Sequence, residues 1–116
     1  MTAIDAFRQL ALSLPEMVEQ PHFEKPSFRV AKKIVATLDV PNQRVCLKLS
    51  ESDQDLFSIF DKTVIYPVPN QWGKQGWTFL DLRKVPEETL RDALTAAYRE
   101  VAPKRLAQLV QPDSEN

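Results

Sequence analysis

A period-two pattern between Ser27 and Leu49 constrains the fold of this chain more than any other feature. Apolar side chains alternate there with polar ones in three short segments, at 28–30, 33–38 and 44–49, and such alternation is typical of half-buried strands. The connections, at 31–32 and 40–43, are too short for a parallel crossover, which needs about a dozen residues. We therefore expect an antiparallel meander.

The alternation predicts that helices cover one face of this meander, which is apolar, and that the other face is open. Four cations are expected on the open face: Arg29, Lys33, Arg44 and Lys48. Residues 22–48 have a local charge of +4 although the net charge of the chain is −1, and residues 51–65 have a local charge of −3. This segregation favours a basic patch on one side of the molecule.

Helical signals flank the strands. Thr2 and Asp5 resemble a capping box, and apolar residues then recur at helical spacing for about 12 residues, up to Pro15. Residues 16–26 are expected to form an irregular connector. A second capping signal, at Ser52 and Asp55, predicts a short helix after the meander.

The C-terminal part predicts one long helix, because Pro86 suits a first helical position and two glutamates follow it. Its expected buried stripe is Leu90, Ala93, Leu94, Ala97, Tyr98 and Val101. A further short helix is expected at 104–110, with Leu106, Leu109 and Val110 packing back on the core. Residues 111–116 contain no apolar anchor and are expected to be disordered, so a single domain spans 1–110.

The segment 66–82 contains both glycines and both tryptophans of the chain. Its prolines place a fourth strand, 64–68, at a sheet edge, and 77–82 reads as a fifth strand with Trp77 and Phe79 on the open face. Gly73 or Gly76 is expected to have a positive φ. The loop between these strands has groups that stack on a flat ligand and hydrogen-bond its edges: Trp72, Lys74, Gln75 and Trp77. Alternatively, the indoles fold back and seal the core.

These elements predict an α+β fold, a two-layer sandwich in which N- and C-terminal helices pack on one face of a five-stranded antiparallel sheet. His22 is the only histidine and Cys46 the only cysteine, so neither a metal site nor an intrachain disulfide is expected. His22 is expected to orient a loop. We find no nucleophile with a base, no cofactor motif and no apolar run of membrane-spanning length. We expect a cytoplasmic, monomeric protein that is not an enzyme.

Several motifs in order resemble the MmcQ/YjbR family of small bacterial proteins. They are Pro21-His22-Phe23, 25–30, Ala36-Thr37-Leu38, Leu47-Lys48-Leu49, Tyr66-Pro-Val-Pro, 72–77 and 102–106. The resemblance implies a fold like that of CyaY, the bacterial frataxin homologue, and binding of double-stranded DNA, with no agreed site residues. Iron binding in that fold is associated with a strongly acidic first helix, whereas the first helix here offers only Asp5.

Two functional hypotheses follow. In the first, a non-catalytic domain binds double-stranded DNA weakly and largely without sequence preference. Its contacts would be the cations Arg29, Lys33, Arg44, Lys48 and Lys74, together with Trp72, Gln75 and Trp77. In the second, Trp72 and Trp77 form an aromatic pocket for a small flat ligand or for a side chain of a protein partner.

Overall fold

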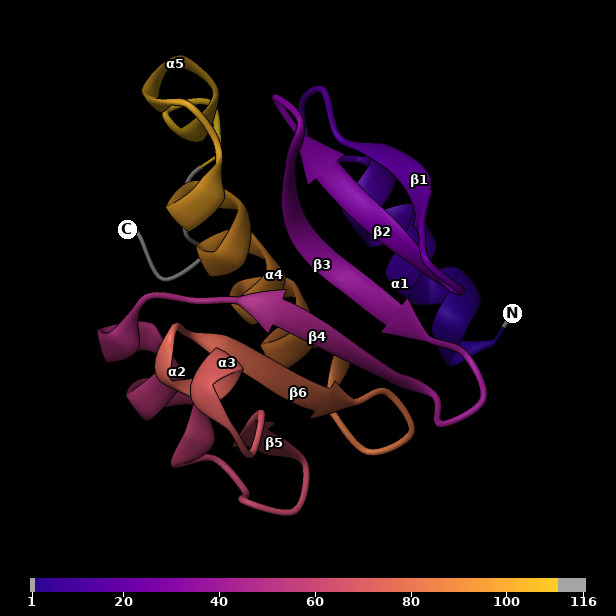
Figure 1. Cartoon of the computed structure of the whole chain (residues 1–116), viewed down its shortest axis with the longest axis vertical. Helices are drawn as coiled ribbons and strands as arrows, with labels where there is room; N and C mark the ends of the chain where they lie inside the picture. Colours follow the sequence, from indigo (N-terminus) through magenta and orange to yellow (C-terminus); the bar gives the residue numbers. More distant parts are fainter. Residues whose placement is uncertain (1, 111–116) are drawn as a thin grey trace.

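A single antiparallel sheet forms one layer of the domain in the computed structural model, which describes residues 2–110. Within these residues the sheet has six strands, in the order β1-β2-β3-β4-β6-β5 (Figure 1). The strands are β1 (Val18–His22), β2 (Lys25–Val30), β3 (Lys33–Asp39), β4 (Arg44–Lys48), β5 (Ile65–Pro67) and β6 (Trp77–Asp81). The helices are α1 (Ala3–Leu12), α2 (Glu51–Ser58), α3 (Gln71–Lys74), α4 (Glu87–Val101) and α5 (Lys104–Ala107).

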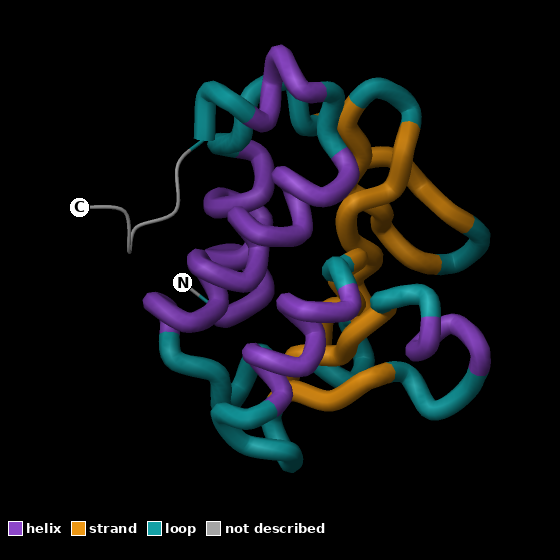
Figure 2. The backbone as a smooth tube through the Cα atoms, turned by 90° about the vertical axis from the view of Figure 1, so that its left-hand side faces the viewer, coloured by secondary structure: helices purple, strands orange, loops and turns teal. Residues whose placement is uncertain are grey.

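The two longest helices, α1 and α4, lie on the same side of the sheet, and a short helical loop projects from the other side (Figure 2). Phe7 of α1 meets Phe28 of β2 edge-on, with ring centroids 5.1 Å apart. Leu94 of α4 is 2% exposed. The predicted α+β architecture with terminal helices on one face is therefore confirmed. No helix in residues 2–110 is both long and apolar enough to span a membrane.

The first helix begins as its sequence predicts. The Thr2 hydroxyl accepts from the Asp5 amide, and the Asp5 carboxylate accepts from the Thr2 amide, which completes the capping box. After the helix, the carbonyl of Pro15 accepts a 2.6 Å hydrogen bond from the Tyr98 hydroxyl. This bond joins α4 to the segment that follows α1.

The predicted number of strands is wrong, because the supposed connector contains β1. This strand pairs antiparallel with β2, from Val18 opposite Arg29 to His22 opposite Lys25. Four of its five side chains are exposed, so β1 shows no apolar alternation, and Pro21 within it disfavours a strand assignment except at an edge. As an edge strand, β1 adds a sixth strand to the predicted five.

The register also corrects the predicted position of Lys33. The hairpin turn places Val30 opposite Lys33, and a register shift between β2 and β3 then places Arg29 opposite Ile34 but Phe28 opposite Ala36. Val35 is the extra residue and is fully buried. Because paired residues point to the same face, Lys33 lies on the side of buried Val30 and not on the open face.

The C-terminal half follows the prediction with small differences. The α2 cap was predicted at Ser52 and Asp55, but the helix begins two residues earlier, where Ser50 accepts from the Asp53 amide. β5 is an edge strand, and α3 lies in the connection between antiparallel β5 and β6. The helix expected at 104–110 ends at Ala107, and Leu109 is 67% exposed instead of packing back. The predicted disordered tail, 111–116, lies outside the described residues.

Candidate ligand-binding pocket

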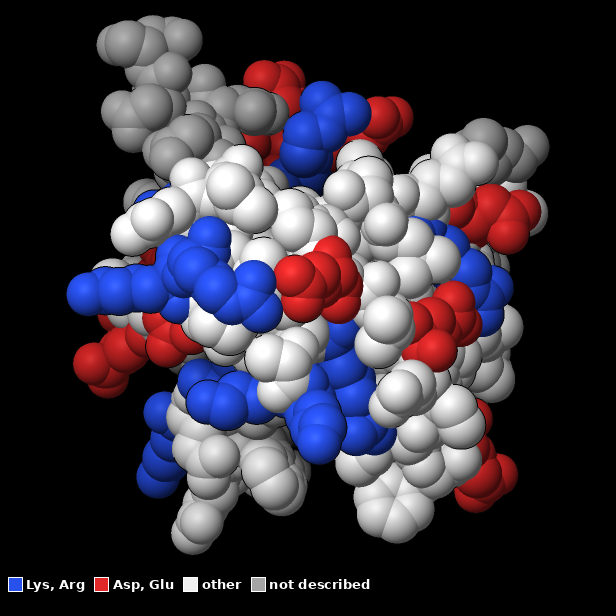
Figure 3. Space-filling model, turned by 90° about the horizontal axis from the view of Figure 1, so that it is seen from above, with Lys and Arg blue, Asp and Glu red and all other residues white. Residues whose placement is uncertain are grey.

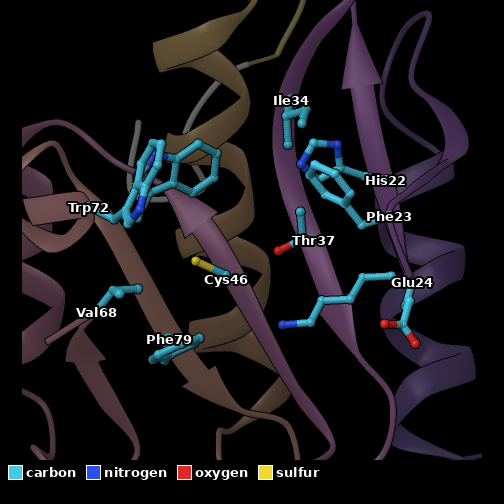
Figure 4. Close-up of a pocket in the computed structure, with 11 residues that line it drawn as sticks. His22, Phe23, Glu24, Ile34, Thr37, Cys46, Val68, Trp72 and Phe79 are labelled. Atoms are coloured by element: carbon cyan, nitrogen blue, oxygen red, sulfur yellow. The ribbon is translucent and has the colours of Figure 1, made fainter. Parts of the chain in front are cut away.

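The open face of the sheet contains a pocket of about 430 Å³ between the β1–β2 turn and α3 (Figure 4). Strand residues line it from the sheet: Ile34, Thr37, Cys46 and Phe79. The β1–β2 turn contributes His22, Phe23, Glu24 and Lys25, and the region around α3 contributes Val68, Trp72 and Trp77. Aromatic and aliphatic groups predominate, and the polar groups include one ammonium and one carboxylate.

The α3 side of the pocket is a rigid loop. The Asn70 side chain caps α3 by accepting from the Trp72 amide at 2.8 Å. Trp72 nevertheless keeps 58% of its surface exposed, so its indole stands beside the pocket instead of sealing the core. Trp77 is half-buried at the start of β6.

Both glycines of this loop allow a close approach of backbone to backbone. A Cβ atom at Gly73 would lie 1.9 Å from the Val68 carbonyl oxygen. A Cβ at Gly76 would lie 1.9 Å from the Leu49 carbonyl oxygen, and Gly76 has a φ of +107°. The prediction of a positive φ is therefore confirmed at Gly76, where the residue type shapes the loop.

A buried amide holds the loop to the rest of the molecule. Gln54, on α2, is 8% exposed, and its Nε2 donates to the Gly73 carbonyl at 2.8 Å and to Thr78 Oγ1 at 3.0 Å. A longer contact of 3.3 Å reaches the Trp77 carbonyl. One side chain thus ties α2, α3 and β6 together behind the two indoles.

The opposite side of the pocket is the β1–β2 turn, which presents Phe23. This residue has a φ of +59° and is 93% exposed, an unusual conformation for a bulky side chain. The rings of His22 and Phe23 meet at 4.7 Å. An Arg29 guanidinium nitrogen lies 3.4 Å from His22 Nδ1, so the imidazole contacts β2.

Arg44 is engaged inside the protein. Its Nε donates to Asp39 at 3.2 Å, its Nη1 donates to the Tyr66 hydroxyl at 3.4 Å, and its guanidinium carbon lies 3.8 Å from the centre of the Phe79 ring. Burial raises the pKa of Asp39, but hydrogen bonds from Asn42 and Arg44 outweigh it, so that pKa lies below its ordinary value. Two of the five guanidinium N–H donors of Arg44 are therefore used within the protein.

Of the eight residues predicted as a site, Trp72 and Trp77 line the pocket. Lys48 is opposite Trp77 in the sheet, whereas Lys74 and Gln75 are exposed at the end of α3. Arg29 and Arg44 are on the open face but are engaged by neighbours. The predicted residues therefore do not form one site: the two tryptophans line the pocket, the two arginines are hydrogen-bonded to neighbouring residues, and the lysines lie outside the lining.

Three cations near the pocket, Lys25, Lys48 and Lys74, form no ion pair with any residue in the described part of the chain. Seen from above, Lys and Arg side chains gather next to a notch between two uncharged projections on the open-face side (Figure 3). An anionic group near the pocket would therefore meet a positive field.

Cys46 is in the floor of the pocket, where burial disfavours its thiolate form. Burial raises the pKa of its thiol to about 11, and nearby Lys25 and Arg44 offset only part of that effect. The thiol is therefore protonated at neutral pH. Across residues 2–110, no group of three or more His, Cys, Asp or Glu side chains is arranged to hold a metal ion.

Sequence reasoning missed most of the pocket. The wall formed by His22, Phe23 and Lys25 falls in the predicted irregular connector, and the sequence gives no signal for the buried role of Gln54. The motif 21–23 and the adjoining 25–30 were nevertheless among the segments that resembled a family, and they form this wall.

The fold and site define a small α+β domain in which an open antiparallel sheet carries an aromatic pocket. The sequence model of the YjbR family matches residues 12–100, and the chain belongs to this family, as its motifs predicted. It is also similar to the crystal structure of Deinococcus radiodurans protein DR2400, described as a DUF419 domain. The TM-score is 0.75 at 22% identity, over 91% of this chain and 86% of that one. No curated protein matches the chain.

Proposed function

We propose that this domain is a non-catalytic binding module whose open-face pocket takes a small, flat, largely apolar molecule that carries an anionic group. The observation that carries the proposal is the pocket of about 430 Å³ between Trp72 and Phe23. That volume is within the usual range for small-molecule sites, which are mostly apolar with a few polar groups.

The lining supports this ligand class. Trp72, Trp77 and Phe79 offer ring surfaces for an aromatic or conjugated body, and such contacts contribute about 1 kcal/mol each. Lys25 supplies an ammonium at the lining, and no ion pair within residues 2–110 neutralises it. Burial raises the pKa of the Cys46 thiol and disfavours its thiolate form, so we assign it no covalent role.

Binding of double-stranded DNA is the second candidate, and the unengaged lysines Lys48 and Lys74 favour it. Against it, Arg44 is committed to Asp39 and Tyr66, and Lys33 is on the other face. A duplex also buries its base faces in its own stacking, so Trp72 has less to contribute there than against a small ligand.

The test titrates the protein with 1-anilinonaphthalene-8-sulfonate, a flat aromatic anion, and follows energy transfer from the tryptophans. We expect saturable binding. Trp72→Ala should weaken it about fivefold, the equivalent of one stacking contact of about 1 kcal/mol. Lys25→Met should weaken it less, by about twofold, and mainly at low salt.

Two controls keep the result specific. Ile59→Ser removes an exposed apolar side chain that does not line the pocket and should leave the affinity unchanged. The second candidate is tested with a labelled DNA duplex, whose binding is followed by fluorescence anisotropy over a salt series. The wild type is compared with Lys48→Glu/Lys74→Glu, and Lys104→Glu on α5 serves as the control.

Equal probe affinity in the wild type and Trp72→Ala would refute the pocket. Tight duplex binding that depends on Lys48 and Lys74 would favour DNA.

A further inference from the structure

A separate surface on α2 exposes three large apolar side chains, which we call the α2 patch: Leu56, Ile59 and Phe60. They are exposed by 64%, 76% and 51%. Their spacing of three and four residues places them on one side of the helix and its final turn. Three adjacent apolar groups at such exposure differ from the scattered single ones of ordinary surfaces.

The patch is held on a rigid support. Gln54 and Phe57 face inward from α2, the former through its hydrogen bonds to Gly73 and Thr78. Beyond the helix, the Phe60 amide donates to the Phe57 carbonyl at 3.2 Å, and the Asp61 carbonyl accepts from the amides of Val64 and Ile65. The backbone beneath the patch is therefore ordered, and its apolar side chains point away from the core.

The segment that contains the patch is acidic. Glu51, Asp53, Asp55 and Asp61 belong to the segment 51–65, where Lys62 is the only basic residue. The patch lies on α2, beside β5 at the far edge of the sheet from β1 (Figure 1). It is therefore distinct from the pocket on the open face, which takes no residue from α2.

We infer that the α2 patch binds a basic, amphipathic segment of another protein. The apolar face of that segment would cover Leu56, Ile59 and Phe60, while its Lys or Arg side chains pair with the acidic residues of 51–61. A second copy of this chain docking through the same patch would oppose acid to acid. An anionic membrane surface would be repelled for the same reason.

The test uses a synthetic amphipathic helical peptide of leucine and lysine, with a scrambled, non-amphipathic peptide of the same composition as its control. Binding is followed by calorimetry and by amide shifts of the labelled protein. We expect saturable binding that perturbs the amides of residues 51–61 and weakens at high salt. Leu56→Ser/Ile59→Ser should weaken it about tenfold, and Asp55→Lys about threefold. Leu109→Ser, which also removes an exposed leucine, should leave it unchanged.

Three results would overturn the inference. The double variant could bind the peptide as tightly as the wild type, or the scrambled peptide could bind as well as the amphipathic one, which would reduce the effect to charge. Sedimentation could instead show that the wild type dimerises and the double variant does not, so that a second copy occupies the patch. Because the substituted side chains are exposed, urea unfolding should show unchanged stability. Asp55→Lys tests the same surface without removing an apolar group.

Discussion

Replacement of Gln54 by methionine and by glutamate tests how the tryptophan loop is held. Methionine keeps the approximate volume but removes the amide donors to the Gly73 carbonyl and Thr78 Oγ1. Each acceptor keeps another partner: the Gly73 carbonyl also accepts from the Gly76 amide, and Thr78 Oγ1 donates to the Gly76 carbonyl. The cost is therefore that of two net hydrogen bonds, about 1–3 kcal/mol of unfolding free energy.

Glutamate at the same position should cost more. Its carboxylate would face the oxygens of Gly73, Trp77 and Thr78 while 8% exposed, which adds repulsion and desolvation to the lost bonds. We expect Gln54→Glu to be at least about 1 kcal/mol less stable than Gln54→Met at neutral pH. This difference in unfolding free energy between the two variants should become smaller at acid pH, because a protonated carboxyl can again donate a hydrogen bond.

Urea unfolding of the wild type and both variants, at neutral and acid pH, measures these differences. Gln54→Asn is the matched control, because it keeps the amide but has a shorter side chain. It should lose most of the unfolding free energy that Gln54→Met loses. If Gln54→Glu were as stable as the wild type, the amide would not hold the loop and the reasoning would be refuted.

Three further predictions concern stability. Gly76→Ala should cost at least about 2 kcal/mol, because alanine is strained at positive φ and its Cβ would meet the Leu49 carbonyl; a loss under half of that in urea unfolding would mean that the loop adapts. Leu94→Ala should cost roughly 2–5 kcal/mol, since the side chain is 2% exposed; a near-zero change would remove Leu94 from the core. The lowered pKa of Asp39 stabilises the native state above about pH 4, and this contribution is lost as pH falls through the native pKa. Asp39→Asn should therefore flatten the acid part of the stability profile, and an unchanged profile would contradict the pairing with Arg44.

The helices and central strands were predictable because their signals are local. The capping box at Thr2 and Asp5, the alternation along β4, and the prolines around β5 each report on a few neighbouring residues. The positive φ at Gly76 was also predictable, because the chain has only two glycines and both fall in this loop. Apolar periodicity reports burial on one face, so it finds elements that contribute to the core.

The errors arose where tertiary contacts override that periodicity. β1 contributes little to the core and therefore has no alternation to detect. The extra residue Val35 reverses the faces around it, which moved Lys33 to the side opposite from the one predicted. Gln54 is polar yet buried, and only the loop folded against it explains why. The pocket joins segments from 22 to 79, and a sequence pattern cannot show that they meet.

The most direct test of the proposed pocket is amide and indole chemical-shift mapping of the protein saturated with 1-anilinonaphthalene-8-sulfonate. The probe should perturb the amides of 22–25, Ile34, Thr37 and Cys46, and the indole N–H groups of Trp72 and Trp77. The same shifts should be reduced in Trp72→Ala and retained in Ile59→Ser. Shifts confined to α2, or spread over the helix-covered face, would contradict a binding site on the open face of the sheet.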